Sequence, residues 1–380
     1  MSNQVRLGVV GTGNMGLGHI RYIANGEIKG LTLTAVCDKS PANVERAKRI
    51  IGSDVKVFDE PEAMFRSGDV DGVLIATPHP FHPALAIAAF SHSLHVLTEK
   101  PAGLHIAEVR KMNEAAAASG KVFGIVFHQR FYGAYSKLRE LIADGELGTI
   151  RRTNWIITEW YRKQSYYNVS PWRGTWAGEG GGSLMTQASH QLDLWQWTTG
   201  MMPARIWAKC YFGKRRDIET DDEVIAFAEY ENGATGVFVV SVTEAPGTNR
   251  YEVVGDRGKA VVEDGRLTFW RLRVPESRFN AEDRPGFPEA WKIEIPVEPS
   301  PHHTVLISDA HKRLMQNWTD AILHGAPLVA RGEEGLLSLT LSNAMYLSTW
   351  TGNWVDVPFD EDLFAAMLQE RINKSDSARV

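Results

Sequence analysis

The sequence has little cysteine and no strong excess of charge of one sign. Only two cysteines, Cys37 and Cys210, occur among 380 residues. They fall in two distant predicted strands, so we expect no disulfide framework. The formal net charge of −5 gives no basic surface of the kind that nucleic acid requires. We therefore expect neither a disulfide-stabilised fold nor a nucleic-acid partner.

The chain also lacks a long apolar segment. No stretch approaches the ~20 apolar residues of a membrane span. The first predicted strand begins by Val5, without a basic and then apolar leader before it. We therefore expect a cytoplasmic protein with no membrane partner. Hydrophobic residues make up 43% of the chain, which is enough for two packed domains at this length.

The N-terminal third alternates short β-branched runs with helical stretches. This alternation is typical of a parallel, doubly wound sheet with right-handed crossovers. We therefore predict an α/β domain of the Rossmann type over residues 1–127. Its strands are expected at Val5–Val10, Leu31–Cys37, Val55–Phe58, Gly72–Ala76, His95–Thr98 and Val122–Phe127.

After His128 the pattern changes to strands that are separated by short turns, which is typical of an antiparallel sheet. We therefore predict that residues 128–380 form a second, α+β domain with a large, mostly antiparallel open sheet. Its expected elements are a helix at 134–144, a strand at 150–160, one helix at 182–199, six strands between 205 and 270, a polar excursion at 274–301, and helices at 305–324 and 333–351.

The most informative motif is the glycine-rich turn GTGNMG at residues 11–16, between the first strand and a helix. Gly11 permits a tight turn, Gly13 lets the backbone approach a pyrophosphate, and Gly16 lets the helix pack closely on the strand. Unpaired amides at the helix N-terminus favour the negative charge of the pyrophosphate. We expect Asn14 and Met15 to complete this cofactor-binding turn.

An acidic residue, Asp38, ends the second strand 22 residues after Gly16. We expect it to accept hydrogen bonds from the adenosine ribose. A carboxylate at this position repels a 2′-phosphate and so favours NAD, but the adjacent Lys39 could bind that phosphate, which leaves NADP open. Strand, turn, helix and acid together predict a nicotinamide dinucleotide as the cofactor.

Two loops follow strands of the predicted sheet at its ligand-binding edge. Thr77, Pro78 and His82 follow the fourth strand, and Glu99 and Lys100 follow the fifth. A charged pair at the carboxyl end of a parallel strand has little structural reason to be there, so we predict that Lys100 is functional. A solvated loop lysine is the alternative interpretation.

A third segment, residues 180–193, has three glycines followed by a predicted helix. The glycines allow close approach of the backbone, and Thr186 and His190 lie four residues apart, on one helical face. A histidine titrates near neutral pH, so His190 could take a proton from a hydroxyl group. The alternative is a structural histidine with satisfied hydrogen bonds.

The loop before these glycines is rich in aromatic residues and carries three cations. Aromatic rings pack against the C–H faces of sugars, and Arg162, Lys163 and Arg173 could hold an anionic group. The alternatives are a sheet core for about half of the rings and solvent exposure for the cations. The aromatic residues are Trp155, Trp160, Tyr161, Tyr166, Tyr167, Trp172 and Trp176.

Histidine pairs at His79/His82 and His302-His303 suggest a metal site only weakly. No cluster of carboxylates or thiolates accompanies them in the sequence, and metal sites usually need such ligands. We therefore predict no metal.

Four motifs, taken in order, resemble the glucose–fructose oxidoreductase and inositol dehydrogenase family (Gfo/Idh/MocA). They are GTGNMG, Glu99-Lys100-Pro101, His128-Gln129-Arg130-Phe131 and GGGSLMTQASHQLD at residues 180–193. The resemblance covers essentially the whole chain. It implies NAD(P)-dependent oxidation or reduction of a sugar or polyol hydroxyl. It also implies a homodimer or homotetramer, because the open sheet of the C-terminal domain often forms the subunit interface in this family.

The resemblance also implies roles for individual residues. Lys100 would contact the reacting hydroxyl and the nicotinamide ribose, His190 would be the acid/base, and the peptide before Pro101 would be cis. Many members carry Asp where this chain has Thr186, whose hydroxyl can only orient substrate. We expect Gln129 at the cofactor. The expected substrate-binding set is Lys100, His128, Tyr166, Tyr167, Trp172, Arg173, Thr186, Gln187 and His190.

Three functions follow from these observations. The first is an NAD-dependent dehydrogenase that acts on a secondary hydroxyl of a sugar, sugar derivative or polyol. The second is a glycosidase that uses NAD in a closed redox cycle on a neutral or anionic glycoside, with Tyr166 or Tyr167 as the base for elimination. The third is a non-catalytic regulator that senses the dinucleotide or a sugar, which the intact Lys100 and His190 argue against.

Overall fold

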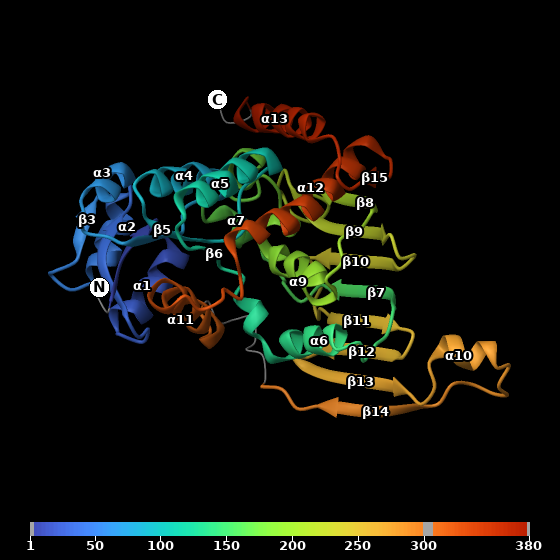
Figure 1. Ribbon diagram of the computed structural model, residues 1–380. Helices are drawn as coiled ribbons and strands as arrows, with labels where there is room; N and C mark the ends of the chain where they lie inside the picture. Colours follow the sequence, from blue (N-terminus) through green and yellow to red (C-terminus); the bar gives the residue numbers. More distant parts are fainter. Residues whose placement is uncertain (1–3, 299–306, 378–380) are drawn as a thin grey trace. The chain divides into compact units, whose positions relative to one another are not determined.

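Six parallel strands, in the order β3-β2-β1-β4-β5-β6, form the N-terminal sheet of the computed structural model, which describes residues 4–298 and 307–377 (Figure 1). β1 and β4 are almost entirely buried, as expected when helices cover both faces of a parallel sheet. The N-terminal elements are β1 (Val5–Val10), α1 (Asn14–Ala24), β2 (Leu31–Cys37), α2 (Pro41–Lys48), β3 (Lys56–Phe58), α3 (Pro61–Arg66), β4 (Gly72–Ile75), α4 (His82–Ser91), β5 (His95–Thr98), α5 (Ile106–Ser119) and β6 (Phe123–Ile125).

This strand order confirms the predicted Rossmann-type sheet. The order reverses between β1 and β4, and ligands of doubly wound sheets bind at this switch point, beyond the carboxyl ends of the strands. The loops that carry Gly11, Thr77 and Lys100 all begin at that edge. The fold therefore positions these three loops for a common ligand.

A late segment of the chain completes this first unit. Trp318 of α11 (Asp309–His324) is buried, and its indole nitrogen donates to the carbonyl oxygen of Val96 at 3.1 Å. A side chain at Gly72 would come within 2.8 Å of the Trp318 ring. Farther along, the amide of Ile125 donates to the carbonyl oxygen of Ala330 at 3.3 Å, beside β6. α11 and the segment after it therefore pack on the N-terminal sheet.

The two compact units consequently differ from the continuous domains that we predicted over 1–127 and 128–380. The first unit runs to Arg130 and includes the late segment up to Leu339, and the second holds Phe131–His302 and Thr340–Val380. The sequence pattern shows that α11 has an apolar face but not which sheet that face covers. The burial of Trp318 against β4 and β5 shows that this face covers the N-terminal sheet.

The second unit contains a nine-stranded sheet in the order β14-β13-β12-β11-β7-β10-β9-β8-β15 among the described residues. Only β7 and β10 pair in parallel, so the sheet is mostly antiparallel, as predicted. The strands are β7 (Ile150–Ile157), β8 (Arg205–Phe212), β9 (Asp221–Glu229), β10 (Thr235–Ser241), β11 (Asn249–Gly255), β12 (Gly258–Glu263), β13 (Arg266–Leu272), β14 (Ala290–Ile295) and β15 (Val355–Asp356).

One face of this sheet is covered by helices (Figure 1). Trp195 of α9 (Ser189–Thr199) donates its indole N–H to Thr153 at 2.9 Å, and Trp155 stacks on Tyr251 with ring centroids 4.1 Å apart. The other face leaves Phe227 of β9 exposed. The helices of this unit are α6 (Gly133–Ala143), α7 (Gln164–Asn168), α8 (Trp176–Glu179), α9 (Ser189–Thr199), α10 (Glu276–Ala281) and α13 (Glu361–Ser377), and α12 (Gly335–Thr351) begins in the first unit.

Two local predictions were wrong. The polar excursion expected at 274–301 contains β14, whose residues Trp291 and Ile293 alternate with charged neighbours on an exposed edge of the sheet. The single helix expected at 182–199 is a π-helical turn, Ser183–Gln187, followed by α9. The amide of Ala188 reaches back five residues to the carbonyl oxygen of Ser183 at 2.8 Å, so Thr186 and His190 do not share one regular helix.

Within residues 4–298 and 307–377, none of the helices combines the length and the apolar character that a membrane span needs.

Replacing Trp318 by Ala tests the assignment of α11 to the first unit. Loss of a buried tryptophan costs about 3–5 kcal/mol in the free energy of unfolding. Urea denaturation should show that loss, and amide hydrogen exchange should place it in β4 and β5. Trp354→Ala is the control, because Trp354 is 42% exposed and should cost less than about 1 kcal/mol. Unchanged exchange in β5 would contradict the assignment.

Candidate active site

The glycine turn after β1 has two glycines that serve the packing of the chain and one that faces open space. Gly11 has a φ of +93°, and a Cβ there would lie 2.6 Å from the carbonyl oxygen of Ala76. A Cβ on Gly16 would lie 1.9 Å from the carbonyl oxygen of Gly11. A Cβ on Gly13 would meet no atom within 4 Å among the described residues. Gly13 is therefore the point where a ligand can approach the backbone.

The N-terminus of α1 lies at this open point. Gly13 is its N-cap and provides no side-chain cap, and the first turn, from Asn14, carries no acidic side chain. The amide groups of this turn are thus available to an anion. The hydroxyl of Thr77, after β4, is buried and has no hydrogen-bond partner among the described residues. Pro78 beside it is partly exposed. These features fit a dinucleotide pyrophosphate.

Asp38 is held against the turn by several donors. Its Oδ2 accepts from the amide and hydroxyl of Thr12, at 2.7 and 3.0 Å, and from the side-chain amide of Asn43 at 3.2 Å. Within the described chain, its Oδ1 accepts only the amide of Ser40, at 2.8 Å. A carboxylate oxygen can take a further donor, so Oδ1 retains capacity for a ribose hydroxyl. Lys39, which left NADP open, is exposed and lies 3.4 Å from Glu60.

Lys100 follows β5, and the residue before it anchors its backbone. Glu99 is buried, and its Oε2 accepts the amide of Lys100 at 3.2 Å. Its Oε1 lies 2.8 Å from Nε2 of His19, whose Nδ1 is 2.6 Å from the Tyr22 hydroxyl. Burial alone would raise the pKa of Glu99, but the His19 hydrogen bond and the Lys100 charge hold it below its usual value. Glu99 is therefore an ionised support for Lys100.

His82, which we predicted at the cofactor, links two loops of the first unit. Its side chain is fully buried, and its two ring nitrogens lie 2.8 Å from the carbonyl oxygens of Pro101 and Thr77. These contacts join the loops after β4 and β5. Burial also lowers its pKa below the usual value, and the two ring nitrogens face carbonyl oxygens of these loops. The Lys100–Pro101 peptide is cis, as the family resemblance implied.

His128 and Gln129, at the end of the first unit's N-terminal part, are both nearly buried. The His128 ring stacks on that of His311 with centroids 3.5 Å apart. The pKa of His311 is well below its usual value because of burial and the neighbouring His128 and His19 rings. Sequence reasoning missed His311, since nothing in its surroundings on α11 marks it out.

In the second unit, a buried carboxylate fixes the glycine run that precedes the π-turn. Asp221 of β9 accepts the amides of Gly182 and Leu184, at 2.8 and 3.0 Å, and the hydroxyls of Ser183 and Tyr346. A Cβ on Gly182 would lie 2.1 Å from the carbonyl oxygen of Asp221. We expected the glycines to allow a close approach of the backbone. At Gly182 the backbone makes that approach to β9 of the same chain.

The structure brings five of the predicted substrate residues together beyond this point. The Tyr166 hydroxyl accepts from Arg173 at 2.5 Å and lies 3.4 Å from Nε2 of Gln187. The Thr186 hydroxyl donates to Oε1 of Glu179 at 3.2 Å. Arg173 also lies over the ring of Trp172, 4.6 Å from its centroid. Sequence reasoning missed Glu179, which is buried at the end of the four-residue α8.

His190 is the second residue of α9 and is 6% exposed. The cofactor turn and Lys100 belong to the first unit, whereas His190 and the cluster around Tyr166 belong to the second.

Tyr167 packs its ring edge-on against Tyr166, with centroids 5.1 Å apart, but its hydroxyl takes no part in the hydrogen bonds of this cluster. Its side chain is buried against Gly174, and its hydroxyl has no hydrogen-bond partner within the described chain. Trp155 and Trp176 are buried as well, whereas Trp160, Tyr161, Tyr166 and Trp172 are partly or largely exposed. Tyr167, Trp155 and Trp176 thus belong to the core.

Burial raises the pKa of both Tyr166 and Tyr167 above the usual value for a phenol, although positive charge nearby opposes it. A phenol with a raised pKa is a poor proton acceptor near neutral pH. This argues against either tyrosine as the base of an elimination.

The cations of this loop have different surroundings. Arg162 lies over the Tyr166 and Trp160 rings, 4.9 and 5.4 Å from the centroids. Lys163 is exposed at the start of α7. Arg162 and Arg173 thus accompany the aromatic cluster, whereas Lys163 lies in solvent.

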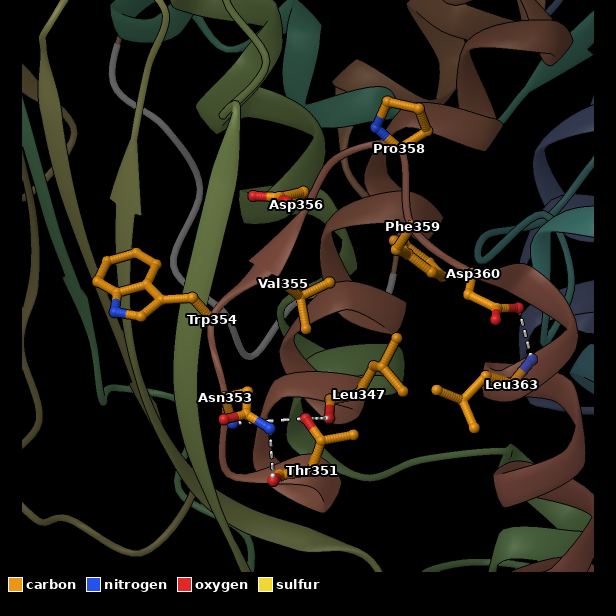
Figure 2. Close-up of a pocket in the computed structure, with 10 residues that line it drawn as sticks. All are labelled: Leu347, Thr351, Asn353, Trp354, Val355, Asp356, Pro358, Phe359, Asp360 and Leu363. Atoms are coloured by element: carbon orange, nitrogen blue, oxygen red, sulfur yellow. Dashed lines mark hydrogen bonds between the residues drawn. The ribbon is translucent and has the colours of Figure 1, made fainter.

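A cavity of about 370 Å³ lies elsewhere in the second unit, between the end of α12, β15 and the start of α13 (Figure 2). Trp354, Phe359 and Leu363 are among the residues that line it. None of the predicted site residues is in its lining. In the part of the chain that the structure describes, no three His, Cys, Asp or Glu residues are placed to hold a metal. His302 and His303 lie outside the described residues.

Three features meet at the switch point: a glycine turn that is open at Gly13, the N-terminus of α1 without a side-chain cap, and the carboxylate of Asp38. Together they define an NAD-binding oxidoreductase of the Rossmann class. Residues 5–127 match the family model of the oxidoreductase family with an NAD-binding Rossmann fold. Residues 135–261 match the GFO/IDH/MocA C-terminal domain. The chain therefore belongs to the Gfo/Idh/MocA family.

Several relatives of known name are similar to this chain. The rhizopine catabolism protein MocA of Rhizobium meliloti is 30% identical over 198 residues, which are 52% of this chain and 58% of that protein. Inositol 2-dehydrogenase 3 of Saccharopolyspora erythraea is 24% identical over 93% of this chain and 95% of its own length. The crystal structure of the WlbA dehydrogenase from Bordetella pertussis, in complex with NADH and UDP-GlcNAcA, is 26% identical with a TM-score of 0.77 and covers 94% of this chain and 100% of its own.

Replacing Asp38 by Ala tests its predicted contact with the ribose. Hydrogen bonds to a charged group contribute about 1.5–3 kcal/mol, so NAD affinity should fall roughly 10- to 100-fold by isothermal titration. NADP affinity should fall less, because the repulsion of the 2′-phosphate is also removed. Lys39→Ala is the control, with NAD affinity nearly unchanged. An equal loss for both dinucleotides would show that Asp38 only holds the turn.

Proposed function

We propose that the chain oxidises a secondary hydroxyl of a sugar, sugar derivative or polyol, with NAD as the hydride acceptor. The observation that carries the proposal is Lys100, which follows β5 at the ligand edge of an NAD-binding sheet and whose backbone is held by the buried Glu99. The names of the inositol dehydrogenase relative and of the WlbA complex with a sugar nucleotide support a carbohydrate substrate.

Different residues of the first unit would bind different parts of the dinucleotide. The amides at the start of α1, next to Gly13, would hold the pyrophosphate, and Asp38 would hold the adenosine ribose. When bound, NAD supplies the acceptor for the hydride that leaves the substrate carbon.

Two side chains act on the reacting hydroxyl in this proposal. Nζ of Lys100 donates a hydrogen bond to the oxygen and stabilises the negative charge that develops on it. A ring nitrogen of His190 takes the hydroxyl proton. The hydroxyl of Thr186 has no such capacity on its own, because an alcohol is not a base near neutral pH. The acid/base step therefore rests on His190, with Lys100 assisting.

The partly exposed rings of Trp160, Tyr166 and Trp172 suit the apolar face of a sugar ring. The adjacent Arg162 and Arg173 suit a substrate that also carries an anionic group. Burial raises the pKa of Tyr166 and of Tyr167, which disfavours either phenol as the base that the redox-neutral glycosidase would need for its elimination. We therefore propose the dehydrogenase alone.

Replacing Lys100 by Ala should lower kcat at least ~10²-fold, because the developing alkoxide loses its partner. NAD binding should persist. The assay incubates the protein with NAD and a panel of neutral and anionic sugars, polyols and aryl glycosides, and follows NADH absorbance and aglycone release together. Lys111→Ala, an exposed lysine of α5, is the control.

Three outcomes of this assay would count against the proposal. Wild-type rates in the Lys100 variant would remove its catalytic role. Release of aglycone at constant NADH would establish the glycosidase. Tight NAD binding with no turnover of any substrate would favour a regulator.

We also propose that the chain forms a homodimer or homotetramer through the exposed face of the nine-stranded sheet. Phe227 is 44% exposed and packs beside Trp207, and its cross-strand neighbour Val237 of β10 is partly exposed on the same face. Exposed apolar side chains gathered on a sheet face favour association.

Light scattering should therefore give two or four times the chain mass of 42.3 kDa. Phe227→Glu should shift the protein toward a monomer, because it places a charge in the interface. The control is Phe287→Ser, since Phe287 is 92% exposed on another segment. A wild-type mass of a single chain would contradict the proposal.

A further inference from the structure

Glu179 is a buried carboxylate directly behind a predicted substrate-binding residue. Its side chain is 1% exposed. Oε2 accepts the amide of Gly174 at 2.6 Å, and Oε1 accepts the hydroxyl of Thr186 at 3.2 Å. A guanidinium nitrogen of Arg173 lies 3.6 Å from Oε1. Thr186 itself is partly exposed, so it connects the buried carboxylate to the surface of the second unit.

These contacts fix the direction of the hydrogen bond between Thr186 and Glu179. The amide of Gly174 and the guanidinium of Arg173 can only donate, and the positive charge favours an ionised carboxylate. An ionised carboxylate only accepts, so the single proton of the Thr186 hydroxyl must point at Glu179. The lone pairs of the Thr186 oxygen then face away from the carboxylate, and Thr186 can act toward a ligand only as an acceptor.

The neighbouring Tyr166 has the opposite polarity. Its hydroxyl oxygen accepts from Arg173 at 2.5 Å and lies 3.4 Å from the amide nitrogen of Gln187. With the oxygen engaged as an acceptor, the phenolic proton is left to donate outward. Arg173 lies between Tyr166 and Glu179 and thereby couples the two residues. The cluster thus offers a ligand one acceptor and one donor.

We infer that Glu179 is a positioning residue that holds Thr186 as a hydrogen-bond acceptor, and that Thr186 thereby selects substrates with a free hydroxyl at the position that faces it. The inference rests on the proposed oxidation of a sugar or polyol. A fluorine or methoxy group at that position brings no proton. It would leave the lone pair of Thr186 opposite another acceptor, and sites built around a substrate hydroxyl discriminate strongly against such analogues.

Replacing Glu179 by Gln should reverse this polarity with almost no change in shape. The amide of Gly174 needs an oxygen at the position of Oε2, so the NH₂ group of the glutamine faces Thr186. Thr186 then accepts from that NH₂ and turns its own proton outward. The measurement is the ratio of kcat/KM for a hydroxyl substrate to kcat/KM for its deoxyfluoro analogue. We expect a ratio of at least about 100 in the wild type and about 10 or less in the variant.

Thr186→Val separates positioning from a structural role. The valine has no hydroxyl to orient, so adding Glu179→Gln to it should leave the ratio unchanged. A ratio that falls equally in both backgrounds would show that Glu179 acts only through the loop at Gly174, and would overturn the inference. Glu219→Gln is the matched control, because Glu219 accepts the amide of Trp176 at 3.1 Å and should not affect the ratio.

Titration of Tyr166 supplies a readout that needs no substrate. Burial raises the pKa of Tyr166 most, the charge of Glu179 adds to this, and Arg173 and Arg162 oppose it. Glu179→Gln should therefore lower the midpoint of the Tyr166 phenol in difference absorbance, with Tyr166→Phe identifying the signal. An unchanged midpoint means an uncharged Glu179 and overturns the inference. Absence of turnover in the wild type would instead overturn the proposed function alone.

Discussion

The second unit's part of the site depends on the carboxylate of Asp221. It is fully buried and takes four donors, two from backbone amides and two from hydroxyls. A buried charge is tolerated when its oxygens are satisfied in this way. Because two of the donors are the amides of Gly182 and Leu184, the same contacts that stabilise Asp221 also determine where the π-turn begins. The positions of Thr186 and Gln187 follow from that starting point.

The next residue of β9 holds a second loop. Asp222 is also buried and accepts the backbone amides of Lys214, Arg215 and Arg216. The side chain of Arg216 in turn donates to the carbonyl oxygen of Arg162 at 2.6 Å. Successive side chains of a strand point to opposite faces of the sheet. Asp221 and Asp222 therefore order two different segments, the glycine run and the aromatic loop. Rigid strands thus position the irregular segments that carry the chemistry.

The parts of the structure that the sequence predicts are those with local causes. β1 and β2 match their predicted bounds, because β-branched runs and flanking turn residues are local signals. The alternation of Trp291 and Ile293 with charged residues could have revealed β14, but prolines around it indicated a loop. The π-turn differs from a helix by hydrogen bonding, not by composition. Asp221 and its partner Gly182 are 39 residues apart, and the buried Glu179 has no local signature, so only the folded chain shows their contacts.

The late position of Trp318 in the sequence affects how the first unit folds during synthesis of the chain. The glycines that leave room for its ring, Gly72 and Gly124, lie in strands that leave the ribosome long before residue 318 is synthesised. Until then the N-terminal sheet has an apolar face without its helix, although domains usually fold in the order of their synthesis. The cofactor-binding unit of this chain can therefore be completed only after most of the second unit has been synthesised.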